Sequence, residues 1–253
     1  MLTLIGLGLW NENDLTLRGI DRAKNSDIAY IELYTSKWYG DVKKLEKIIS
    51  KKIKVLKRKD LEEDSDIILK EAEDKNVVLF IPGDPLVATT HISLISDTRK
   101  KGIDVEIIHN ASIYSAIAEV GFHIYSFGAT ATVPFPEKTG GKLPKSIYET
   151  LKMNKLNGFH TLLLLDVMAE ENKYMTPNEG IKIMLKTEEK MNDEVFTEDT
   201  EIVVFARAGS EKPLIVYGKV KDLLNKDFGK PPFVIIVPGQ MHFTEKEYLE
   251  QFR

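Results

Sequence analysis

Short apolar runs alternate with amphipathic stretches through the first half of the chain. The run at 77–81, Val-Val-Leu-Phe-Ile, is continuous and breaks sharply at Pro82-Gly83-Asp84-Pro85, which is typical of a strand buried on both faces of a parallel sheet. Similar runs predict strands at 2–9, 28–33, 53–56 and 105–108. Apolar residues at helical spacing predict helices at 14–24, 41–50, 65–75 and 90–101. This alternation predicts an α/β fold with a mostly parallel sheet.

The pattern changes between residues 126 and 146. Several prolines and the Gly140-Gly141 pair interrupt the periodicity, so we interpret this stretch as a mobile loop at the crossing into a second domain. Beyond it the sequence predicts strands at 161–166, 201–208, 214–220 and 233–237, and a helix at 177–191 that starts with proline. We therefore expect two α/β domains, 1–122 with the mostly parallel sheet and 123–253 with a mixed sheet.

Composition and charge narrow the functional classes. The chain of 253 residues has no cysteine, which excludes disulfides, thiolate metal sites and cysteine nucleophiles. Its net charge of −4 argues against a nucleic-acid-binding protein, because phosphate contacts need basic surfaces. No apolar run approaches the roughly 20 residues of a membrane span. The chain begins directly in a predicted strand, so we expect no signal peptide.

Candidate chemistry lies where the predicted strands end. Asp84 follows the strand at 77–81, and parallel sheets bind small molecules beyond the carboxyl ends of their strands. The same residues are also ordinary turn formers, so a plain turn is the alternative. Gly6 and Gly8 let the backbone approach a ligand, but Asn11 stands where the dinucleotide fingerprint needs glycine. Ser112 can cap a helix, contact a ligand at the same place, or do both.

Metal binding is not expected from the sequence. The five histidines (91, 109, 123, 160 and 242) are scattered and lack the spacing of metal ligands. No Gly-x-Ser-x-Gly nucleophile signature is present either.

Five segments carry a family resemblance. They are 4–9 (Leu-Ile-Gly-Leu-Gly-Leu), 82–91 (Pro-Gly-Asp-Pro-Leu-Val-Ala-Thr-Thr-His), 112–115 (Ser-Ile-Tyr-Ser), 160–166 (His-Thr-Leu-Leu-Leu-Leu-Asp) and 206–210 (Ala-Arg-Ala-Gly-Ser). In this order they resemble the diphthine synthases. The Gly-Asp-Pro element is shared with the wider tetrapyrrole methylase superfamily, whereas the continuation after it and the Ser-Ile-Tyr-Ser segment are more specific to diphthine synthases.

The resemblance implies a fold and an activity. Members are S-adenosylmethionine-dependent methyltransferases with two α/β domains, which hold the cofactor in the cleft between them and release S-adenosylhomocysteine. They are cytosolic homodimers and need neither a membrane nor a nucleic acid. Their substrate is translation elongation factor 2, at a histidine that already carries a 3-amino-3-carboxypropyl group. Methylation of its amino group gives diphthine, a step of diphthamide biosynthesis.

The resemblance also implies the cofactor contacts. In the first domain these are Leu9, Asp84, Val87, Ser112 and Ile113, and in the second Leu165 and Ala208. A further contact in relatives is the histidine of a Pro-Pro-His segment, and Phe233 takes its place here. If backbone atoms make that contact, phenylalanine can replace histidine; if the side chain makes it, the interaction on the adenine side is altered.

Methyl transfer from a sulfonium is an in-line displacement that depends mainly on alignment. The attacking amine must first lose a proton, because an ammonium has no lone pair. Asp84 and Asp166 are candidate bases, and desolvation of the amine is the alternative. Arg207, Lys138 and Lys142 are expected either to meet an acidic partner or simply to be solvated.

Two other functions remain open from the sequence. One is a small-molecule methyltransferase acting on precorrin-type tetrapyrroles, which would share the fold and the Gly-Asp-Pro element. The other is a non-catalytic nucleotide-binding module.

Overall fold

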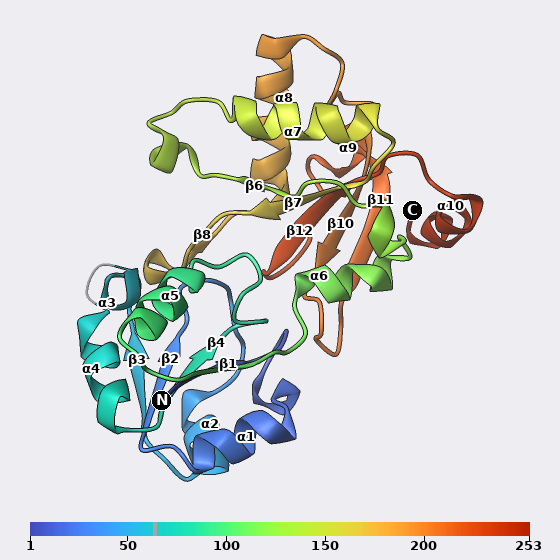
Figure 1. Cartoon of the computed structure of the whole chain (residues 1–253). Coiled ribbons are helices and arrows are strands. Elements are labelled where there is room, and N and C mark those ends of the chain that lie inside the picture. The colour runs from blue at the N-terminus through green and yellow to red at the C-terminus, as the bar shows by residue number, and fades with distance from the viewer. Residues whose placement is uncertain (63–64) are drawn as a thin grey trace. The chain divides into compact units, whose positions relative to one another are not determined.

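The computed structural model describes residues 1–62 and 65–253, which form two compact units (Figure 1). Unit 1 comprises Met1–Tyr114 with Ala169–Asn172, and unit 2 comprises Ser115–Met168 with Lys173–Arg253. The contacts thus divide the chain between Tyr114 and Ser115, and the domain boundary after residue 122 stays a prediction.

Unit 1 is built on a parallel sheet, as the sequence predicts. Its described strands, in the spatial order β3-β2-β4-β1-β5, all pair in parallel. They are β1 (Leu2–Gly6), β2 (Ile28–Glu32), β3 (Ile53–Leu56), β4 (Val77–Ile81) and β5 (Val105–Ile108). All residues of β4 are buried, and they alternate between the two faces. β1 is shorter than predicted, because the chain turns away after Gly6.

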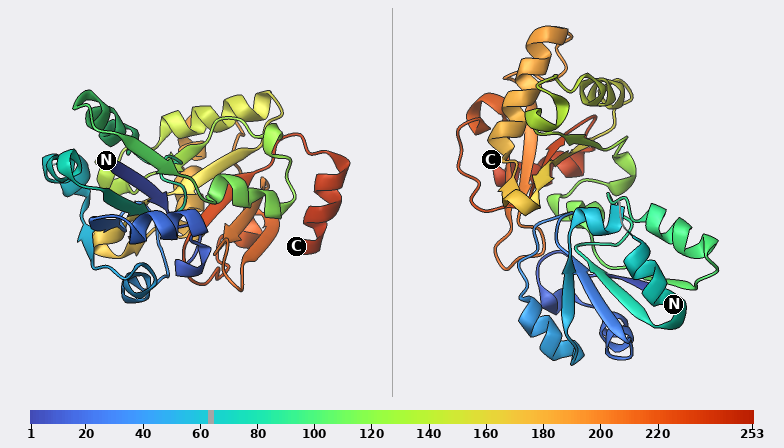
Figure 2. Two further views of the ribbon diagram at one scale, coloured as in Figure 1. Left: turned by 60° about the horizontal axis from the view of Figure 1, so that its bottom comes forward. Right: turned by 90° about the vertical axis from the view of Figure 1, so that its left-hand side faces the viewer.

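Helices cover both faces of this sheet (Figure 2). On one face lie α1 (Leu17–Lys24) and α2 (Val42–Ile49), and on the other α3 (Arg58–Glu62), α4 (Asp66–Asp74) and α5 (Ile92–Lys100). The side chains of Thr16 and Asp41 cap α1 and α2 by accepting backbone amide hydrogens. The chain leaves the adjacent strands β1 and β4 towards opposite faces, which is the arrangement that opens a ligand crevice at the carboxyl ends of such strands.

Unit 2 contains the predicted mixed sheet. Its described strands, in the order β11-β10-β12-β7-β6, pair in antiparallel fashion except for β6 with β7. They are β6 (Ala131–Val133), β7 (Thr161–Leu165), β10 (Glu201–Ala206), β11 (Leu214–Lys219) and β12 (Phe233–Val237). A separate hairpin joins β8 (Val167–Met168) and β9 (Lys173–Tyr174).

Helices of unit 2 include three that the sequence did not predict. The helices are α6 (Ile113–Ala116, which begins in unit 1), α7 (Lys145–Leu156), α8 (Pro177–Met191), α9 (Val220–Leu223) and α10 (Phe243–Leu249). α7, α9 and α10 were missed, whereas α8 starts as predicted, with Pro177 directly after Thr176 within a Thr176–Glu179 capping box. The loop interpretation of 126–146 was wrong in part, because β6 and the start of α7 lie within it.

Candidate functional site

Three loops meet at the carboxyl ends of the neighbouring strands β4, β1 and β5. Gly8 and Gly83 form an antiparallel bridge, with the Gly8 amide 3.2 Å from the Gly83 oxygen and the Gly83 amide 2.9 Å from the Gly8 oxygen. A Cβ on Gly6 would lie 2.6 Å from the Gly83 oxygen, so only glycine permits this approach. These glycines therefore bring the loops after β1 and β4 together.

Asp84 joins the loop after β4 to the loop after β5. The residue is 6% exposed, and Oδ1 accepts a hydrogen bond from the Leu86 amide at 3.0 Å. Oδ2 accepts one from the Asn110 amide at 3.2 Å and lies 2.7 Å from Nδ1 of His109. The carboxylate thus fixes both loops, which goes beyond the plain turn that the sequence left open.

Asn110, which was not predicted as a site residue, completes the connection between these loops. Its side-chain amide donates to the carbonyl oxygens of Gly6 and Asp14, at 2.9 Å each, and its Oδ1 accepts from the Ala111 amide at 2.7 Å. One side chain after β5 therefore holds both the end of β1 and the loop that follows it. The local signal was only an asparagine after a predicted strand, which is common in turns.

The five predicted cofactor residues of unit 1 lie on these connected loops. Leu9 follows the Gly8–Gly83 bridge, and Val87 follows Asp84, to whose carbonyl oxygen its amide donates at 3.3 Å. Ser112 is buried and directly precedes α6, at which Ile113 begins. Leu9, Val87 and Ile113 are partly exposed, so apolar surface remains available around the buried Asp84. The structure brings these residues to one edge of the sheet.

The predicted residues of unit 2 also share one sheet edge. Ala206 lies opposite Phe233 in the β10–β12 register, and the β12–β7 register, continued by one residue, places Leu165 opposite Phe233 on its other side. Ala208 follows two residues after the end of β10. Phe233 is 7% exposed and its side chain belongs to the hydrophobic core of unit 2, so this side chain is engaged within the unit.

The candidate base Asp166 is already engaged within unit 2. Its carboxylate accepts hydrogen bonds from the amides of Phe135 (2.9 Å) and Val167 (2.8 Å), and Lys138 Nζ lies 2.7 Å away. Arg207 likewise donates to carbonyl oxygens of its own unit, including that of Phe228 at 2.7 Å. Lys138 and Arg207, which were expected to meet a partner or water, therefore hold loops of unit 2 in place.

A buried acid and a buried histidine lie beneath the loop after β4. Glu32, at the end of β2, is 0% exposed and accepts hydrogen bonds from the amides of Tyr34 and Thr35. Its Oε1 lies 4.0 Å from Nε2 of His91, the residue that ends this loop and is itself buried. Burial raises the pKa of Glu32 to about 7, and burial lowers the pKa of His91. At each group desolvation outweighs the hydrogen bonds and nearby charges that favour ionisation, which favours the neutral form of both side chains.

Residues 1–62 and 65–253 contain neither a metal-binding cluster nor a membrane-spanning helix. In that part of the chain, no three side chains of His, Cys, Asp or Glu lie together in a way that could hold a metal ion. No helix there has the length and apolar character needed to cross a bilayer.

The comparisons with known proteins agree on one family. The family model described as Tetrapyrrole (Corrin/Porphyrin) Methylases matches residues 1–224. The diphthine synthase of Methanocaldococcus jannaschii is 46% identical over 253 residues, covering 99% of this chain and 98% of the relative. That of Methanococcus maripaludis strain C7 is 45% identical over 251 residues, covering 99% and 98%. A crystal structure of diphthine synthase matches with a TM-score of 0.89 at 35% identity, covering 99% of this chain and 95% of the other.

Proposed function

The chain belongs to the tetrapyrrole methylase family and, within it, to the diphthine synthases, and on this basis we propose that it methylates a modified histidine of translation elongation factor 2. The diphthine synthases are S-adenosylmethionine-dependent methyltransferases of diphthamide biosynthesis. The acceptor in the proposal is the amino group of the 3-amino-3-carboxypropyl substituent, and the product is diphthine. The observation that carries the proposal is the 46% identity to a diphthine synthase across 99% of this chain.

The proposed cofactor contacts come from both units. Leu9, Val87 and Ile113 offer apolar walls suited to an adenosine, and Asp84 with Ser112 supplies polar groups beside them. In unit 2 the contacts are proposed at Leu165, Ala208 and the backbone of Phe233. The close approach of the loops after β1 and β4 supports this assignment. Their glycines carry no side chain that would stand between the backbone and a ligand at this edge of the sheet.

When bound, S-adenosylmethionine supplies an electrophilic methyl group on a sulfonium that leaves as neutral S-adenosylhomocysteine. The task left to this chain is to align the acceptor amine with that methyl group and to exclude water. All the bonds described for Asp84 and Asp166 serve to hold loops, which makes either a weak candidate for the base. The proposal therefore has the amine lose its proton to water as it is desolvated.

Two further features of the proposal rest on the family resemblance alone. These are assembly as a homodimer and a cytosolic location. Sedimentation velocity at micromolar concentration tests the first, and a monomer would contradict it.

Mass spectrometry of the factor tests the proposed function directly. The enzyme is incubated with S-adenosylmethionine and elongation factor 2 that carries the 3-amino-3-carboxypropyl histidine, and we expect a mass gain of added methyl groups on that residue. The matched control is the factor with an unmodified histidine, which should gain no mass. Methylation of a precorrin without methylation of the factor would assign the chain to the tetrapyrrole branch. Binding of adenosine triphosphate, with no calorimetric binding of S-adenosylmethionine, would instead support a nucleotide-binding module.

A further inference from the structure

Basic residues are concentrated in one short stretch of an otherwise acidic chain. Residues 37–59 contain ten Lys and Arg but only two Asp and Glu. The whole chain has 35 Lys and Arg against 39 Asp and Glu, so 25 basic and 37 acidic side chains lie outside this stretch. The small net charge of −4 is therefore the sum of a basic segment at 37–59 and an acidic remainder, and net charge alone does not reveal this uneven distribution.

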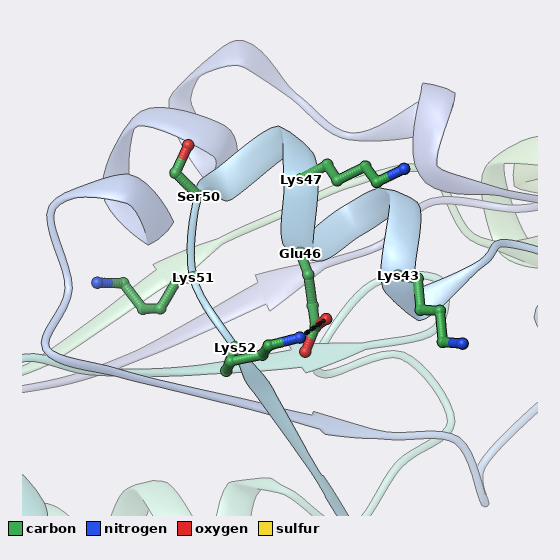
Figure 3. A pocket seen from close by; sticks show the side chains of 6 residues that line it. All are labelled: Lys43, Glu46, Lys47, Ser50, Lys51 and Lys52. Atoms are coloured by element: carbon green, nitrogen blue, oxygen red, sulfur yellow. Dashed lines mark hydrogen bonds and ion pairs between the residues drawn. The ribbon is translucent and has the colours of Figure 1, made fainter.

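The structure arranges part of this stretch as a continuous surface on α2 and the turn that follows it. Lys43 and Lys47 lie one turn apart on α2, and Lys51 follows in the turn after the helix; together we call them the α2 lysine surface. They line an open depression with Glu46, Ser50 and Lys52 (Figure 3). The turn is made by Ser50, whose φ of 56° ends the helix in the left-handed region.

The charges of the α2 lysine surface are only partly offset by nearby acids, since Glu46 attracts Lys43 without forming an ion pair with it. Lys43 and Lys47 are exposed and Lys51 is partly exposed, and none of them forms an ion pair with a carboxylate of residues 1–62 or 65–253. Glu46, the acid in the depression, is taken by Lys52, whose Nζ lies 2.9 Å from Oε2. Three ammonium groups therefore face solvent without a counter-charge in contact.

The direction of these side chains indicates what kind of partner they suit. In Figure 3 the side chains of Lys43 and Lys47 extend to one side of the view and that of Lys51 to the other, so the three ammonium groups do not converge on one small anion. The nearby aromatic side chains are also used within the fold, since Trp38 is buried and Tyr39 stacks on Trp10 at 4.1 Å. No aromatic lies among the lysines to stack single-stranded bases. The arrangement suits an extended acidic protein surface better than a nucleic acid.

From these observations we propose that the α2 lysine surface docks an acidic face of the protein substrate before methyl transfer. This inference rests on the proposed function, in which the acceptor is carried by a protein. The excess of acidic side chains outside 37–59 repels an acidic partner, so the basic surface decides where such a partner first makes contact. Lysines act here as point charges that speed encounter and orient the partner, and this effect weakens as salt screens it.

Paired triple variants test the inference. The surface variant carries Lys43→Gln, Lys47→Gln and Lys51→Gln, because glutamine removes the charge but keeps an unbranched polar side chain and a similar helix propensity. The control variant carries Lys182→Gln, Lys186→Gln and Lys190→Gln on α8, where the three exposed lysines have the same spacing and their loss changes the net charge equally. Methylation of the modified factor is measured for both variants and for the unsubstituted enzyme at low and high salt, with the affinity for S-adenosylmethionine measured by calorimetry.

We expect kcat/KM for the factor to fall about fivefold in the surface variant at low salt, with kcat and cofactor affinity unchanged. The difference should vanish at about 0.5 M salt, where the Debye length is roughly 4 Å. The control variant should behave like the unsubstituted enzyme. Equal effects of the two triples, or a loss in the surface variant that persists at high salt, would overturn the inference.

Other outcomes distinguish a failure of the docking inference from a failure of the proposed function. If the unsubstituted enzyme does not methylate the factor at all, the proposed function fails, whatever the lysines do. If it methylates the factor, and the surface variant loses only the binding of a short RNA duplex in a gel shift, then the surface belongs to a nucleic acid and the docking inference is wrong.

Discussion

Replacing Glu32 with glutamine should change how the stability of unit 1 depends on pH. Burial raises the pKa of Glu32 from an ordinary value of 4.5 to about 7, against opposing hydrogen bonds from Thr35 and Tyr34. Between pH 4.5 and about 7, the Glu32 carboxyl is therefore protonated in the folded chain and ionised in the unfolded chain. The stability that this proton brings is fully present below about pH 4.5, and it is lost as the pH rises through about 7.

The size of this effect follows from the pKa values. A shift from 4.5 to about 7 corresponds to about 3 kcal/mol of unfolding free energy, at roughly 1.4 kcal/mol for each pH unit. Glutamine retains an oxygen that can accept the amide hydrogens of Tyr34 and Thr35 but does not titrate. The lowered pKa of His91 contributes with the opposite sign, since its share of stability grows as the pH rises through the unfolded value. This share is present in both proteins and largely cancels in their difference.

Urea unfolding at pH 5, 6, 7 and 8 measures the effect. Relative to the unsubstituted protein, Glu32→Gln should gain about 2.5 kcal/mol between pH 5 and pH 8, because part of the full effect already acts at pH 5. Two parallel stability profiles would refute the assignment of a neutral buried carboxyl.

Glu245 provides a contrast of opposite sign. It is 1% exposed, and burial alone would raise its pKa, but the amides of His123 and His242 and the nearby His160 outweigh burial and hold the pKa below its ordinary value. The stability that the ionised Glu245 brings is present above the ordinary value of 4.5 and is lost as the pH falls through the lowered one. Glu245→Gln should therefore cost most near neutral pH and least in acid. If the stabilities of Glu32→Gln and Glu245→Gln, each relative to the unsubstituted protein, changed with pH in the same direction, the two variants would report a general sensitivity to acid and not two opposite pKa shifts.

Three further substitutions test the loops. Asp84→Ala should weaken S-adenosylmethionine binding in calorimetry by about tenfold, because two loops lose their common acceptor; unchanged affinity would remove Asp84 from the site. Gly6→Ala should lower the unfolding free energy by about 1–3 kcal/mol in urea, since its Cβ would lie 2.6 Å from the Gly83 oxygen, and a neutral result would show that this strand end can shift. Asp166→Asn should keep kcat within about twofold in methylation assays, because Asp166 is paired with Lys138; a loss of about a hundredfold or more would restore it as the base.

Strong local patterns made much of the fold predictable. All residues of β4 are apolar, so its burial on both faces was visible in the sequence, and the five strands of the parallel sheet lie within or at their predicted ranges. α7 was hidden, because it buries Asn154 together with Ile147, Tyr148 and Leu151 and directly follows Pro144. β6 spans only Ala131–Val133, which is too short to show an alternating pattern.

The roles of the site residues were harder to predict than their positions. Asp84 could be placed at a strand end from sequence, but its bond to the Asn110 amide joins residues 26 positions apart. The bond of the Asn110 side chain to Gly6 spans 104 positions, and no local pattern encodes such a contact. Likewise, the pairing of Asp166 with Lys138 was invisible, although both residues had been singled out separately.

These long-range bonds suit the chemistry that we propose. Methyl transfer from a sulfonium depends chiefly on alignment, so a small displacement of either reactant is costly. The loops that would supply that alignment are held by one another as well as by their strands, through the Gly8–Gly83 bridge, the carboxylate of Asp84 and the side chain of Asn110. A carboxylate that fixes two loops contributes to such a reaction without exchanging a proton. The polar residues at this edge are therefore better understood as positioning groups than as acids or bases.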